Sequence, residues 1–284
     1  MTSQRASLPL VALCFALAAV GLIETWAHSG VTGYGWDAVA YWRAWRSGMY
    51  DGPVGTPGHY LYSPAFAQLV WPLAQTTWPI FATFFIGINA IGLAWLLRPL
   101  PLILAVPLWL AGTQEIVSGN VFIPMAIATV IGMRHPQAWA FVVLTKVTPA
   151  LGPLWFAVRG EWSAVRKAAL TTVAVVAVSW LITPGLWTQW FEFLVQQWHV
   201  AGEAVGYEFV PGPLYRMPVA LALVVVGART DRVWLLPVAM VLATPFFWNG
   251  SLTLLAAVPR LLQGRHVSSA TDSAAQPVMR HASP

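Results

Sequence analysis

Long apolar runs separated by short polar segments constrain this 284-residue chain more than any other feature. Residues 8–27 and 77–97 are each long enough to cross a bilayer, which takes a helix of about 20 residues. Only 9% of the residues are charged, too few to cover a soluble globule of this size, since soluble domains average roughly a quarter. The runs are continuous rather than alternating, which favours helices over a β-barrel. We therefore predict an all-α polytopic membrane protein.

The domain organisation predicted from composition is simple. No stretch has the composition of a soluble domain, so we expect one membrane domain over residues 1–262 and a disordered cytoplasmic tail over residues 263–284. The chain starts as a signal peptide would, with Arg5 before an apolar core, but the many later spans favour a retained first helix. A single cysteine, Cys14, excludes an intramolecular disulfide. The net charge of +5 fits basic cytoplasmic loops, so no nucleic acid partner is expected.

The fifteen basic residues decide between alternative topologies, because Lys and Arg collect in cytoplasmic loops. Residues 64–75 form either a span or an interfacial helix, and residues 137–158 form either one span or a hairpin that turns at residues 146–149. An interfacial helix, a hairpin and a further outward turn at residues 244–250 together put eleven basic residues inside and four outside. Changing either of the first two choices alone puts most of them outside. We therefore predict about ten membrane-entering helices, with both chain ends in the cytoplasm.

Most acidic residues fall on the outer face in this topology, together with the longer loops. Only three acids fall on the cytoplasmic side. We therefore expect the functional site on the outer face of the membrane. The outer acids are Glu24, Asp37, Asp51, Glu115, Glu192, Glu203 and Glu208.

Asp37 lies in the first outer loop, within the sequence GWDAVAYWRAWR, beside Trp36, Tyr41 and Trp42. If residues 37–47 are helical, Asp37 and Tyr41 share one face, because residues four apart lie one above the other. Two roles stay open for the aspartate. It either caps the N-terminus of that helix or serves as a general base for a hydroxyl at the membrane surface.

Lys146 lies at the turn of the predicted hairpin, in the sequence LTKVTPALGP. Each arm has about ten residues, or roughly 15 Å of helix, which is half the hydrocarbon thickness. Such arms would hold Lys146 near the outer boundary, and Pro149, which lacks an N–H, suits the start of the returning helix. A cation there either snorkels to water or binds an anion. The second reading makes it a clamp for a phosphate at the level of the lipid headgroups.

Aromatic residues gather in two further outer segments. The sequence HYLYSPAF places Tyr60 and Tyr62 at the start of the predicted interfacial helix. Interfacial tyrosines commonly anchor proteins in membranes, and they also suit stacking on a sugar or an isoprenoid. Helical spacing also relates five apolar residues of the second segment and predicts an amphipathic surface helix, which we interpret as structural. They are Trp187, Trp190, Phe191, Leu194 and Trp198.

Several common catalytic motifs are missing from the sequence. It contains no phosphate-binding glycine loop, no HExxH and no Gly-x-Ser-x-Gly. The acids form no obvious metal cluster. We therefore expect neither a cofactor nor a metal ion.

Five short motifs, by their order and spacing, resemble the polyprenol-phosphate-mannose-dependent mannosyltransferases of glycosyltransferase family 87, in the GT-C superfamily. They are Asp37 with Tyr41 four residues on, YLYSPAF at 60–66, SGN ending at Asn120, TKVTP at 145–149 and TPFFWNG at 244–250. The resemblance covers about residues 8–262. The family often has glutamine where Asn120 stands and histidine where Asn249 stands.

The resemblance implies a GT-C-like helical bundle and a specific activity. Such enzymes take a sugar from a polyprenyl-phosphate donor outside the cytoplasmic membrane and add it, with inversion, to a lipid or glycan acceptor. The resemblance implies that Asp37 is the base and that Lys146 lies near the donor phosphate, where we also expect Arg43. Residues expected to contact the substrates are Tyr41, Tyr60, Tyr62, Glu115, Asn120, Trp248 and Asn249. An inverting transfer of this kind needs one base and a cation for the leaving phosphate.

A non-catalytic membrane protein is the alternative: a transporter, a lipid-handling subunit or an inactive relative of the GT-C enzymes. Transporters tend to place ionisable residues near the middle of the membrane, and they often contain inverted repeats. Here the charges collect at the outer surface and the sequence contains no visible repeat, which favours an enzyme.

The predicted topology can be tested by labelling introduced cysteines in intact cells. In a Cys14→Ala background, Ser47→Cys and Gln196→Cys should react with an impermeant maleimide, because both outer loops face the medium. Ser163→Cys should stay unlabelled, because the charged segment around it is predicted to be cytoplasmic. Labelling of Ser163→Cys in unbroken cells would contradict the hairpin at residues 146–149.

Overall fold

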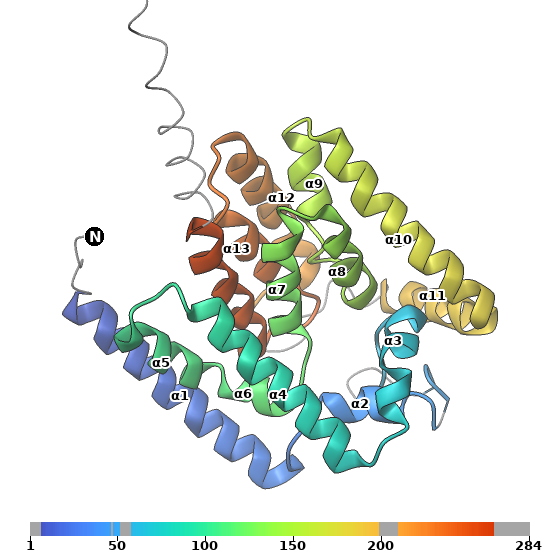
Figure 1. Cartoon of the computed structure of the whole chain (residues 1–284), viewed down its shortest axis with the longest axis horizontal. Coiled ribbons are helices and arrows are strands. Elements are labelled where there is room, and N and C mark those ends of the chain that lie inside the picture. The colour runs from blue at the N-terminus through green and yellow to red at the C-terminus, as the bar shows by residue number, and fades with distance from the viewer. Residues whose placement is uncertain (1–6, 47, 52–57, 199–209, 264–284) are drawn as a thin grey trace, which may run out of the picture.

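The computed structural model describes residues 7–46, 48–51, 58–198 and 210–263, so the predicted tail lies almost entirely outside the described residues. Every regular element in the described ranges is a helix, which confirms the all-α polytopic class (Figure 1). Within the described ranges, three helices are long and apolar enough to cross a membrane: α1 (Leu8–Thr32), α4 (Trp78–Leu97) and α10 (Trp162–Ile182). The count of about ten membrane-entering helices stays a prediction.

The other helices are shorter. They are α2 (Ala38–Arg43), α3 (Pro64–Ala74), α5 (Leu102–Ala111), α6 (Thr113–Ser118), α7 (Phe122–Gly132), η1 (Pro136–Ala138), α8 (Trp139–Thr145), α9 (Gly152–Val158), α11 (Pro184–Trp198), α12 (Pro213–Arg229), α13 (Leu235–Leu242) and η2 (Asn249–Ala257), of which η1 and η2 are 3-10 helices. Among them, α11 lies at the edge of the bundle beside the end of α10 (Figure 1). At 11 residues, or roughly 16 Å, α3 is too short to span the hydrocarbon core, which agrees with an interfacial helix.

The chain breaks and reverses between α8 and α9, as the sequence predicts. Lys146 adopts an extended conformation and ends α8. Gly152, at the start of α9, then packs against the ring of Trp139 at the start of α8, where a Cβ on the glycine would lie 1.9 Å from ring carbon Cε2. Each arm has seven residues rather than the predicted ten or so, because η1 and a longer loop take up the rest.

Amphipathic helix α11 lies where the aromatic spacing predicts it. Trp187 and Trp190 are buried and pack against each other edge to face, with ring centroids 5.4 Å apart. Phe193 is buried beside them, whereas Phe191 is exposed, so the buried face is rotated slightly from the predicted stripe. The indole of Trp187 donates to Ser179 Oγ at 3.0 Å, which ties α11 to the end of α10.

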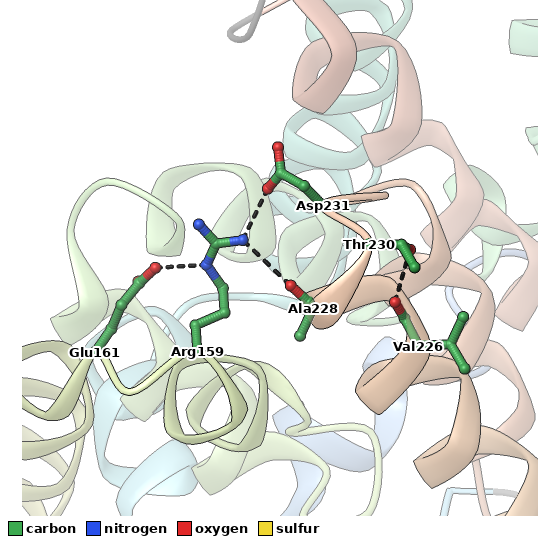
Figure 2. A network of polar contacts seen from close by, with 6 residues as sticks. All are labelled: Arg159, Glu161, Val226, Ala228, Thr230 and Asp231. Atoms are coloured by element: carbon green, nitrogen blue, oxygen red, sulfur yellow. Dashed lines mark hydrogen bonds and ion pairs between the residues drawn. The ribbon is translucent and has the colours of Figure 1, made fainter.

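Two charged loops that the topology assigns to the cytoplasm meet at one end of the bundle (Figure 2). Arg159, which follows α9, donates from Nη1 to the carboxylate of Asp231 at 2.8 Å and from Nε to that of Glu161 at 2.5 Å. Nη1 also donates to the carbonyl of Ala228 at the end of α12. Surface ion pairs of this kind stabilise a fold by only about 0–1 kcal/mol. These pairs therefore show that the two loops lie together, but they contribute little to the free energy that holds them there.

Helices α2 and α6, which carry the predicted outer-face residues, lie at the opposite end of the bundle (Figure 1). Opposite ends therefore hold the basic loops and the acids of the predicted site, as the positive-inside argument requires. Which end faces the outside of the cell stays a prediction.

A left-handed glycine joins α6 to α7 at the end that carries the site. Residues 113–118 form the short helix α6, with Ile116 N–H donating to the carbonyl of Gly112. Gly119 then has a φ of +71°, the usual conformation just past a helix end. A Cβ on Gly119 would lie 2.8 Å from Cβ of Ala38 and 3.3 Å from Cβ of Phe85. The glycine thus lets α6 approach α2 and α4 closely.

Replacing this glycine should destabilise the fold by more than backbone strain alone. Gly160 has a similar φ of +74° but nothing within 4 Å of the position that a Cβ would occupy, so Gly160→Ala isolates the strain, about 1–2 kcal/mol. Gly119→Ala adds the clash with Ala38 and Phe85, and we expect it to lower Tm further in detergent-purified protein. Equal Tm losses for the two variants would show that the contact with α2 contributes nothing.

Candidate functional site

Asp37 lies at the start of α2 and is held from two sides. Its N–H donates to the carbonyl of Ser118 at 3.1 Å, and the N–H of Gly35 donates to the carbonyl of Val117 at 2.8 Å. Asp37 Oδ2 accepts a hydrogen bond from Asn120 Nδ2 at 3.2 Å. Of the two roles that the sequence leaves open for Asp37, the helix cap is wrong, because the carboxylate makes no capping hydrogen bond and instead accepts from the amide of Asn120.

Asn120 connects Asp37 to two tyrosines. Its Oδ1 accepts from the N–H of Val121 at 2.7 Å and lies 3.4 and 3.3 Å from the hydroxyls of Tyr41 and Tyr62. Those two hydroxyls are 3.1 Å apart. The backbone carbonyl of Asn120 accepts from Asn89 Nδ2 at 2.9 Å. The structure therefore brings three predicted substrate contacts into one network with the predicted base.

Lys146 reaches the same cluster from the loop after α8. Its Nζ lies 4.2 Å from the ring centroid of Phe122 and 5.3 Å from that of Tyr62, within the range of cation–π attraction. Among the described residues, Nζ makes no hydrogen bond or ion pair. Burial lowers the pKa of the Lys146 ammonium, while the nearby carboxylates of Asp37 and Glu115 oppose that shift. Such an ammonium is available to an anionic ligand.

Glu115 is the second acid of the cluster, and it is only 2% exposed. Its Oε1 accepts from the N–H of Phe122 at 2.9 Å. Burial raises the pKa of the Glu115 carboxyl, and the negative charge of Asp37 raises it further. Burial also raises the pKa of Asp37, but the positive charge of Lys146 opposes that rise. Lys146 opposes the rise in pKa of Glu115 as well, so the two acids and the lysine form one electrostatic cluster.

The turn at residues 248–250 completes the cluster from the C-terminal part of the chain. Trp248 is 48% exposed, and Asn249 donates from Nδ2 to the carboxylate of Glu24 on α1. Gly250 lies directly against Glu115, since a Cβ on the glycine would be 2.3 Å from Oε2. The three segments that carry Asn249, Glu115 and Glu24 thus converge at the same end of the bundle.

Two predicted residues are outside the hydrogen-bond network of Asn120. Tyr60 is buried, its hydroxyl donates to the carbonyl of Ser63 at 2.9 Å, and its ring centroid lies 5.6 Å from that of Tyr62. Arg43 is exposed on α2 beside Gly58, and the described residues show no contact from it to Lys146. Contacts of Tyr60 and Arg43 with substrates stay predictions.

Sequence reasoning missed four residues of the site. Glu24 and Asn89 each carried a signal, because polar groups inside apolar helices are costly and usually have a specific partner. Ser118 and Phe122 carried no such signal in the sequence. Ser118 contributes its backbone carbonyl, which accepts from the N–H of Asp37, and only the fold brings the ring of Phe122 to Lys146. Within the described ranges, no group of three His, Cys, Asp or Glu side chains is placed to hold a metal ion.

The fold and the cluster define an all-helical membrane protein with an acid, an amide and a lysine gathered at one end of its bundle. A model of glycosyltransferase family 87 matches residues 60–268, and the chain therefore belongs to that family. It is a membrane glycosyltransferase, as the resemblance of its motifs implies, and the transporter alternative finds no support. No curated protein and no solved structure matches the chain.

The matched residues include Glu115, Asn120, Lys146 and Asn249 but begin after Asp37. The position of Asp37 in the site therefore rests on the structure, through its hydrogen bond with Asn120. The match by itself assigns no role to the aspartate.

Proposed function

We propose that the protein transfers the hexose mannose from a polyprenyl-phosphate donor to a lipid or glycan acceptor. The transfer takes place on the extracytoplasmic face of the cell membrane. The transfer inverts the anomeric carbon, and Asp37 is the base. One observation carries the proposal: Asp37 and Lys146, a lysine with no ion-pair partner among the described residues, lie in one cluster at the end of the bundle opposite the basic loops.

Asp37 accepts the proton of the acceptor hydroxyl. The Asn120 amide donates to Oδ2, which helps to fix the carboxylate that receives the proton. As the hydroxyl oxygen forms its bond to the anomeric carbon, the bond from that carbon to the phosphate oxygen breaks on the opposite face. The bonding electrons leave with the phosphate, and the proton passes to Asp37. Because burial raises the pKa of Asp37, its carboxylate is a stronger base than an exposed aspartate.

Lys146 stabilises the negative charge that develops on the departing phosphate. A preorganised cation in a water-poor site is worth more than the same cation in water, because the low dielectric strengthens the attraction. Polyprenyl phosphate is already a good leaving group, so a fixed positive charge can replace a proton donor. The rings of Phe122 and Tyr62 hold the ammonium without neutralising it.

An apolar groove beside Lys146 suits the isoprenyl chain of the donor. The groove has a volume of about 600 Å³ and lies between α3, α8 and α10. Phe66, Leu69 and Val178 line it, and Thr145 forms part of its wall directly before Lys146. A donor whose phosphate binds Lys146 could therefore place its chain in this groove, where apolar surface is removed from water and from bulk lipid.

Changing the charge of Lys146 tests the proposed donor. We expect Lys146→Ala to raise the KM for polyprenyl-phosphate-mannose by at least about tenfold, and Lys146→Arg to raise it much less because it keeps the charge. The Ala/wild-type KM ratio should be the same for long-chain and short-chain donors, because both carry the same phosphate. The long-chain donor should have the lower KM throughout, because it fills more of the groove.

The pH profile supplies the control for this prediction. Lys146 lowers the pKa of Asp37, so its removal should move the acid limb of kcat/KM to higher pH, and Lys146→Arg should leave that limb near its original place. A Lys146→Ala variant with unchanged KM and an unchanged acid limb would make the lysine a snorkelling residue without a role in donor binding.

A further inference from the structure

A single buried carboxylate joins the starts of two helices that are far apart in the sequence. Glu115 Oε1 accepts from the N–H of Phe122, the first residue of α7, at 2.9 Å. Oε2 lies against Gly250, the second residue of η2, at 2.3 Å from the position a Cβ would occupy. Neither role is part of the proton transfer or of the phosphate contact described above.

Contact with Glu115, rather than backbone conformation, is what excludes a side chain at position 250. Gly250 is not among the described glycines with a positive φ, so an alanine there would not be strained. An alanine would have to push Oε2 aside. Glu115 is only 2% exposed, so its carboxylate has little room to move, and moving it would strain the hydrogen bond to Phe122.

The start of η2 is held on its other side as well. Asn249 donates to the carboxylate of Glu24, and Ser251 Oγ donates to the carbonyl of Trp248 at 2.7 Å. The start of α7 in turn carries the ring on which Lys146 rests, 4.2 Å from Nζ to the ring centroid. A displacement of Glu115 therefore reaches both the turn at residues 248–250 and the lysine.

We infer that Glu115 is a positioning residue for sugar transfer, which holds the start of η2 against the start of α7, and that Gly250 provides the space for its carboxylate. The inference rests on the proposed function only for the identity of the donor used as a probe. Glu115 acts through Phe122 and the turn at residues 248–250, and it takes no proton from the substrate.

Four variants test this positioning role: Gly250→Ala, Glu115→Asp, the two combined, and Gly87→Ala as a matched control. Gly87 is a helical glycine with nothing within 4 Å of a Cβ position, so its replacement should leave kcat unchanged. Gly250→Ala should lower kcat with polyprenyl-phosphate-mannose about tenfold, since small misplacements in a site are costly. The shorter side chain of Glu115→Asp makes room for the alanine, so the combined variant should regain at least about threefold over Gly250→Ala.

A labelling measurement tests the contact between Glu115 and Gly250 without relying on enzymatic activity. Ser251 is fully buried, so Ser251→Cys in a Cys14→Ala background should react slowly with a maleimide in purified protein. Adding Gly250→Ala should speed the reaction, and adding Glu115→Asp as well should slow it again. Unchanged labelling in Gly250→Ala, or faster labelling with unchanged kcat, would overturn the inference. A wild-type protein that transfers no mannose would overturn the proposed donor, and the labelling rates would still decide the Glu115 contact.

Discussion

The side-chain amide of Asn120 is the group on which the arrangement of the site depends. Its nitrogen donates to Asp37 at 3.2 Å, and its oxygen faces the hydroxyls of Tyr41 and Tyr62 at 3.4 and 3.3 Å. One amide therefore joins the first loop, the segment before α3 and the connection between α6 and α7. In a chain with so few charges, each buried polar group needs such a partner, because an unpaired one costs about 1–3 kcal/mol.

The three ionisable side chains of the site interact in a buried setting, where charges attract or repel one another more strongly than in water. Two acids, Asp37 and Glu115, lie near one lysine, and burial disfavours the charged form of all three. Lys146 favours the ionised form of both acids. They differ in their hydrogen bonds, because Asp37 accepts from the side-chain amide of Asn120 and Glu115 accepts from the backbone N–H of Phe122.

Hydrophobic runs, prolines and charge positions predict much of this fold, because each acts locally. The reversal between α8 and α9 falls at Lys146 and Pro149, where the sequence predicts it. The long runs place α4 within one residue of its bounds, whereas α1 continues to Thr32, past the predicted end at residue 27. The contacts of the site are different. A sequence read alone assigns Asp37 to a helix cap as easily as to a site, because its partner Asn120 comes from α6–α7. Likewise, no local pattern indicates that Gly250 lies against Glu115.

Sugar transfer by purified protein tests the central claim, that Asp37 is the base of a membrane glycosyltransferase. Wild-type protein, Asp37→Asn and the exposed control Asp51→Asn would be incubated with radiolabelled polyprenyl-phosphate-mannose and a mixed lipid extract, and the products separated by chromatography. Asparagine can keep the hydrogen bond to Asn120 but cannot accept the proton, so we expect normal protein yield and transfer reduced by at least about a hundredfold. Asp51→Asn should transfer at nearly the wild-type rate. A fully active Asp37→Asn would contradict the account.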